Sequence, residues 1–80
     1  MADEQIRRLI DNDLVDGQHG IIDGNPDRVE RAIGRLTARA EVLGAVGRHL
    51  NCREALDAEA TLRDELRRLM HAQQFAPLNS

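Results

Sequence analysis

The sequence contains no lysine, tryptophan or tyrosine, and only one cysteine, two prolines and one phenylalanine. Because Schiff-base chemistry needs a lysine amine, the lack of lysine excludes that class of covalent catalysis. The single Cys52 excludes an intrachain disulfide and the cysteine framework of small secreted domains. Since Phe75 is the only aromatic residue, the core must consist of alanine and aliphatic side chains.

Long apolar runs are absent as well. No segment approaches the roughly 20 consecutive apolar residues that a membrane-spanning helix requires. The residues after Met1 are Ala-Asp-Glu-Gln, which do not resemble a basic leader followed by an apolar stretch. We therefore expect a cytoplasmic protein without membrane contact. The net charge of -3 argues against general affinity for nucleic acid, although one basic face can exist on an acidic protein.

The short chain limits what a single copy can bury. Eighty residues make one small domain at most, and a chain of this size buries only about 60% of its unfolded surface. With 41% hydrophobic and 31% charged residues, the composition is that of a folded protein rather than a disordered tail. Because the core is small, we expect self-association, most simply as a dimer.

Motifs that carry chemistry are missing. The sequence has no Gly-x-Ser-x-Gly, no phosphate-binding loop and no glycine pattern that follows a strand. His49 and Cys52 have a spacing that zinc sites use, but a structural zinc needs four ligands, and His71 would lie roughly 30 Å away along a helix. We therefore expect a protein that is not an enzyme and holds no metal or cofactor.

The apolar pattern and the turn residues predict a first helix, a loop and the start of a second helix. Apolar residues recur at helical spacing over residues 3–15, which predicts a short helix. Residues 16–25 contain three glycines and several turn dipeptides, which predict a loop. Asn25, Pro26 and Asp27 supply a capping side chain, a proline at the first helical position and an acid in the first turn.

Two longer helices are expected over residues 26–50 and 52–73. Their apolar ladders are out of phase, and Asn51 with Glu54 has the spacing of a capping box, so we expect a break near Asn51. The short connection favours an antiparallel hairpin, whereas one long helix with a stutter in its repeat is the alternative. Residues 74–80 contain a proline and no periodicity, which predicts a flexible tail.

The pattern predicts an all-α fold in which hairpins associate into a helical bundle. In the second helix the apolar residues alternate at intervals of four and three, as in a coiled-coil-like seam, and the small Ala40 and Gly47 permit close approach. We expect the seam of the oligomer to consist of Val29, Ile33, Leu36, Ala40, Leu43, Leu50, Leu62, Leu66 and Leu69.

Arginines form a row in the second expected helix. Arg28, Arg31, Arg35 and Arg39 are three and four residues apart and fall within an arc of about 80° on one side of the helix. No carboxylate stands four residues from Arg28, Arg35 or Arg39, so something outside the helix should supply negative charge. The candidates are acids of the first helix or its symmetry mate, an acidic surface on another protein, and a phosphate.

Together these features predict a small helical protein that binds a larger protein as an inhibitor, adaptor or assembly factor. The arginine row, with Arg63 and Arg67 of the third helix, would contact a partner or an anion, and Phe75 with Leu78 would form an apolar anchor. Two alternatives stay open. One is a protein that grips the phosphates of a nucleotide or nucleic acid through the arginines, and the other is a structural subunit of a larger assembly.

Overall fold

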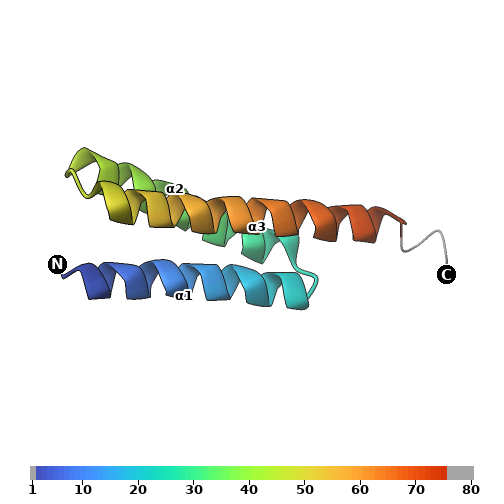
Figure 1. Cartoon of the computed structure of the whole chain (residues 1–80). Coiled ribbons are helices and arrows are strands. Elements are labelled where there is room, and N and C mark those ends of the chain that lie inside the picture. Colours follow the sequence, from blue (N-terminus) through green and yellow to red (C-terminus); the bar gives the residue numbers. More distant parts are fainter. Residues whose placement is uncertain (1, 76–80) are drawn as a thin grey trace.

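The computed structural model describes residues 2–75, apart from the side chain of Phe75. It has three α-helices, which are α1 (Asp3–Ile22), α2 (Pro26–Ala45) and α3 (His49–Phe75). The described residues contain no strand, so the all-α prediction is confirmed. The helices contact one another pairwise in an elongated body of 50 × 17 × 14 Å, with the α1–α2 turn and the α2–α3 turn at opposite ends (Figure 1).

The first helix is longer than the sequence pattern predicts. The prediction of a loop over residues 16–25 is wrong for most of that range, because α1 continues to Ile22 and only residues 23–25 lie between α1 and α2. Gly17 and Gly20 are buried inside this helix. A Cβ atom on Gly17 would lie 2.5 Å from a methyl carbon of Leu62, and one on Gly20 would lie 2.8 Å from a methyl carbon of Val29. These glycines therefore allow the helices to approach closely, which offsets the roughly 1 kcal/mol that each costs in a helix.

The start of α2 matches the prediction from its sequence. The side chain of Asn25 accepts a hydrogen bond from the backbone N–H of Arg28 at 3.3 Å, and Pro26 is the first helical residue. The turn before it contains Gly24, whose φ of 66° lies in the left-handed region that favours glycine. The capping residue, the proline and the preceding glycine thus fix where the second helix begins.

α2 ends before the break that was expected near Asn51. α2 ends at Ala45, and Gly47 then adopts a φ of 80°. The N–H of Arg48 donates to the carbonyl of Leu43 at 2.9 Å, and the N–H of Gly47 donates to that of Gly44 at 3.2 Å. This bonding is a Schellman motif, which needs the left-handed glycine and ends the helix there. Residues 26–75 are therefore not one long helix.

The third helix absorbs residues that were expected outside it. It begins at His49 and runs to Phe75, so it covers more than the predicted residues 52–73. Asn51 lies within its first turn, is buried, and donates from its side chain to Glu54 at 3.1 Å instead of capping the helix. The Schellman motif places the turn at Val46–Arg48, so the capping-box spacing at Asn51 does not mark a helix start.

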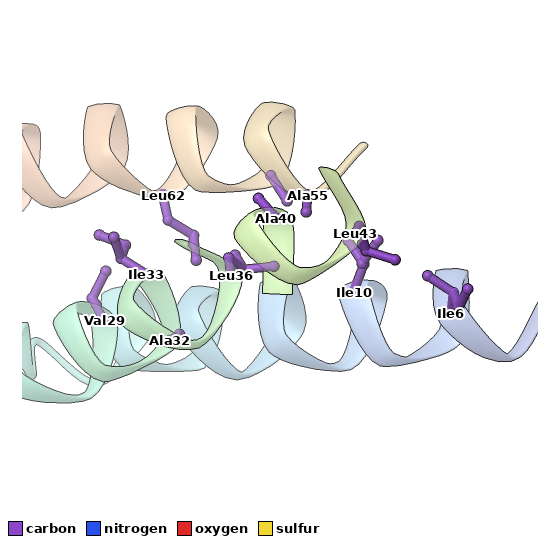
Figure 2. Packing of buried hydrophobic residues seen from close by; sticks show 11 residues of the cluster. Ile6, Ile10, Val29, Ala32, Ile33, Leu36, Ala40, Leu43, Ala55 and Leu62 are labelled. Carbon is purple, nitrogen blue, oxygen red and sulfur yellow. The ribbon is translucent and has the colours of Figure 1, made fainter. Parts of the chain in front are cut away.

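The core consists of small and aliphatic side chains from all three helices (Figure 2). Leu36, Leu62 and Val29 are its largest fully buried side chains. Six of the residues expected to form a seam between copies lie in this core of the single chain: Val29, Ile33, Leu36, Ala40, Leu43 and Leu62. Side chains buried within one copy have little surface left for a second, so an interface between copies has to use other residues.

The remaining seam residues are placed differently. Leu66 packs against the core and is partly buried, and Leu69 is half-buried. Leu50 is 79% exposed, because it lies just after the α2–α3 turn and not inside a continuous helix. The four-and-three pattern therefore identified core positions correctly as far as the end of α2, but it did not extend across the turn.

Candidate functional site

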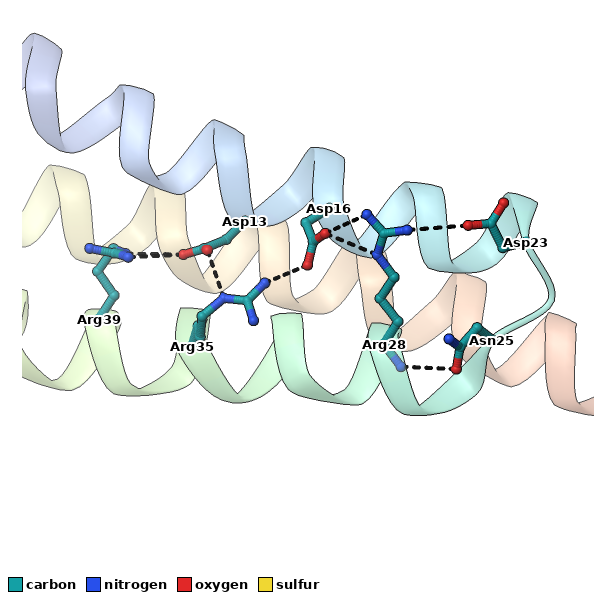
Figure 3. Close-up of polar contacts among 7 residues, drawn as sticks. All are labelled: Asp13, Asp16, Asp23, Asn25, Arg28, Arg35 and Arg39. Atoms are coloured by element: carbon teal, nitrogen blue, oxygen red, sulfur yellow. Dashed lines mark hydrogen bonds and ion pairs between the residues drawn. The ribbon is translucent and has the colours of Figure 1, made fainter.

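The arginine row of α2 meets two aspartates of α1, Asp13 and Asp16 (Figure 3). Arg28 donates from Nε and Nη2 to one oxygen of Asp16, at 3.0 and 2.7 Å, and also bonds Asp23 at 3.2 Å. Arg35 bridges the two aspartates, with 2.9 Å to Asp13 and 2.6 Å to Asp16. These contacts tie the second half of α1 to α2.

Asp13 is the most buried member of this network. Arg39 donates to it from Nε at 3.2 Å and from Nη2 at 3.0 Å, while Arg35 binds its other oxygen. Its side chain is only 10% exposed. A carboxylate in this position needs paired cations, because burying an unpaired charge is costly. Asp13 and Asp16 are three residues apart and so share one face of α1, which aligns them with the row.

Charge pairing shifts the proton affinities in this network. Hydrogen bonds from Arg28, and then from Arg35, lower the pKa of Asp16 below its ordinary value of 3.8. Hydrogen bonds to Asp13 and Asp16 raise the pKa of Arg35. Both shifts favour the charged forms, so Asp16 and Arg35 stay ionised at neutral pH.

The six arginines predicted to bind a partner or an anion do not form one surface. Arg28, Arg35 and Arg39 are engaged by α1, whereas Arg31 is exposed and has no ion pair with the described residues. The other two lie on α3, where Arg63 binds Glu59 at 2.8 Å and Arg67 binds Asp64 at 2.8 Å. The acids of the first helix were one of three candidates for the missing negative charge, and they supply it for three of the four arginines in the row.

A groove of about 970 Å³ lies between α2 and α3. We call it the α2–α3 groove. Leu66, which packs against the core, and Met70, which is 50% exposed, line it from α3. Arg63 and Arg67 line the same side, so this wall is basic.

The α2 wall of the groove carries acidic residues at both ends. Glu30 and Glu41 line it and are exposed, and neither has an ion pair with the described residues. Between them are Gly34 and Ala38. A Cβ atom on Gly34 would meet nothing within 4 Å, so no intrachain contact in the described part accounts for a glycine there.

The α2–α3 groove was not predicted from the sequence. Gly34, Glu30 and Glu41 matched no motif and had no predicted role. The available signal was a stripe that repeats every three to four residues, with acids at both ends and small residues between them. Which glycines have an intrachain contact could not be known before the helices were placed.

Other predicted features add no second site. The proposed anchor of Phe75 and Leu78 lies outside the described side chains. Within the described residues, no group of three or more His, Cys, Asp or Glu side chains could hold a metal ion. In that part of the chain, no helix is long and apolar enough to cross a membrane.

Comparisons with known proteins do not place this chain in a family. No protein-family model, no curated protein and no solved structure matches it.

Proposed function

We propose that this protein is not an enzyme and that it acts by binding another polypeptide, with the α2–α3 groove as the docking site for a helical segment. α2 and α3 then work as an antiparallel hairpin that is covered by α1 on one side and by the docked helix on the other. This role fits an inhibitor, an adaptor or an assembly factor in the cytoplasm. The α2–α3 groove carries the proposal.

Contacts between the two helices support the hairpin. The hydroxyl of Thr37 donates to Glu59 at 2.8 Å, near the middle of both helices. At the far end, the side chain of Gln73 donates to the carbonyl of Gly24 at 2.9 Å. From Thr37 on α2 back to Gly24 in the turn just before α2, the residue number falls while the partner on α3 rises from Glu59 to Gln73, which is the pattern of two helices that run in opposite directions.

The shape of the groove suits a helix better than a small molecule. Packed helices lie 8–10 Å apart, a typical spacing that requires small side chains where the backbones approach. Gly34 and Ala38 provide such a place, and half-exposed Met70 offers an adaptable apolar contact. Helix-in-groove recognition uses this combination of an apolar stripe and charged flanks.

The phosphate-binding alternative has less support. Arg28, Arg35 and Arg39 already bind carboxylates, so a phosphate would have to replace Asp13 or Asp16 as their partner. The alternative of a structural subunit uses the same groove, which a neighbouring subunit would then fill.

A photo-reactive amino acid tests the docking site. We expect that placing it at Met70 in the groove gives a covalent product with a second polypeptide in cells. The matched control places it at Asp11, which is exposed on α1 and has no ion pair with the described residues. Adding Gly34→Leu to the Met70 probe should remove the product, because the larger side chain fills the groove. Equal products at both positions, or none at Met70, would refute the proposal.

A further inference from the structure

We propose that the polypeptide that binds the α2–α3 groove is a second copy of this chain, whose own α2 and α3 pack across the groove in a dimer with its twofold axis along the groove. This inference rests on the proposed function and names the occupant. It follows from the two charged walls of the groove, the register between α2 and α3, and the open space at Gly34.

The two walls carry opposite charge. On the α2 wall, Glu30 and Glu41 have no ion pair with the described residues. On the α3 wall, Arg63 and Arg67 are 59% and 75% exposed. Each wall is therefore complementary to the other wall of a second copy, and complementary charges select partner and orientation.

Symmetry decides which walls meet. If two copies pack groove to groove, a twofold axis along the groove sets α2 of each copy on α3 of the other. A twofold axis across the groove sets α2 on α2 and α3 on α3 instead. The second arrangement brings acids to acids and arginines to arginines, so the charges favour the axis along the groove.

The register of the helices places the charges opposite each other. Thr37 lies level with Glu59, because their side chains are hydrogen-bonded. Seven residues back along α2 is Glu30, and seven residues on along α3 is Leu66, which is next to Arg67. An axis along the groove keeps these levels, so Glu30 of each copy meets Arg67 of the other, and the pair forms twice.

Gly34 supplies an independent observation. It stands one turn from Glu30 on the same wall, where a glycine costs roughly 1 kcal/mol relative to alanine. A Cβ atom at position 34 would meet no atom of the described residues within 4 Å. At Gly17 and Gly20, in contrast, neighbouring side chains occupy the space that a Cβ atom would take. The close approach of a second copy explains the glycine at this position.

Charge reversal on the two walls tests the dimer. Glu30→Arg removes no ion pair of the described chain, and Arg67→Glu leaves Asp64 bound to Arg68 at 2.7 Å, so both variants should fold. Wild type should sediment at twice the chain mass of 9.0 kDa. Each variant alone should associate at least about tenfold more weakly, because like charges then face each other. An equimolar mixture of the two should restore the dimer.

Controls make each outcome decisive. Asp11→Arg on α1 should leave association unchanged, and Gly34→Leu should give a helical monomer. The chain has no Trp or Tyr, so interference optics should follow the sedimentation. The inference is overturned if the mixture stays monomeric, if either variant alone dimerises like wild type, or if wild type is a monomer. A monomer whose Met70 probe still captures another protein would refute the second copy and leave the proposed function standing.

Discussion

Asp16 joins two arginines of α2 to α1. The sequence predicted that these arginines need a negative partner, but not which residue provides it. Arg28 and Arg35 bind its two oxygens. The row of arginines predicted that a partner charge was needed, and acids of the first helix were among the candidates. Asp13 and Asp16 could not be singled out among the acids near the first helix, because which of those acids face the row depends on how α1 packs on α2.

The stability that Asp16 contributes should depend on pH. Its pKa is lowered in the folded state by Arg28 and Arg35, so the unfolded state takes up a proton first as the pH falls. The stabilisation is therefore complete well above pH 3.8 and is lost as the pH falls through and below that value. At pH 6 we expect Asp16→Asn to lower the free energy of unfolding by about 1 kcal/mol, the upper end for partly exposed ion pairs.

Urea denaturation followed by circular dichroism at pH 6, 4 and 3 checks this prediction. The curves of wild type and Asp16→Asn should converge toward the lowest pH. Asp11→Asn removes an exposed charge that has no ion pair with residues 2–75, so it serves as the control and should change stability by no more than about 0.5 kcal/mol. A difference between wild type and Asp16→Asn that stays constant with pH would contradict the role of the arginine pairs.

The helices themselves were predictable where local signals decide. Asn25 and Pro26 marked the start of α2 correctly, because capping is a local interaction. The predictions for two glycines were wrong in opposite ways. Gly17 was assigned to a loop although it lies inside α1, and Gly47 was assigned to a helix although it ends one. Only contacts with other helices and a left-handed φ separate these cases, and neither can be read from spacing.

Two substitutions to alanine should therefore have opposite effects. Gly17→Ala should lower the free energy of unfolding by about 1–3 kcal/mol, because its Cβ would crowd the side chain of Leu62. Gly34→Ala should raise it by about 0.5–1 kcal/mol, because helix propensity improves and no atom of the described residues would meet the new Cβ atom. Chemical denaturation at low protein concentration, where a dimer contributes least, measures both. The same sign for both variants would contradict the assigned contacts.

The molecule as a whole is elongated because helices of 20, 20 and 27 residues lie along one axis. Its Cα radius of gyration is 14.3 Å. The apolar ladder predicted the core positions of α2 well, since a 3.6-residue period reports the buried face directly. The ladder could not show whether that face is buried within one copy or between two copies. Six of the positions expected between copies are buried within a single copy.

Small-angle X-ray scattering should show how the dimer is arranged. A twofold axis along the groove places the copies side by side, so the maximum dimension should stay close to that of the monomer while the cross-section grows. The monomeric Gly34→Leu variant provides the reference. Association end to end would instead lengthen the particle well beyond the 50 Å of one copy, and such a result would contradict the groove as the interface.

The unequal surroundings of the glycines also predict how the sequence can change through evolution. At positions 17 and 20 a Cβ atom would crowd Leu62 and Val29, so selection for stability should favour glycine there. Position 34 is open in a single copy, and mutation alone would soon replace its glycine with residues that favour helices. If orthologues retain glycine or alanine at position 34 while Glu30 and Arg67 exchange charge together, natural selection is acting on the groove.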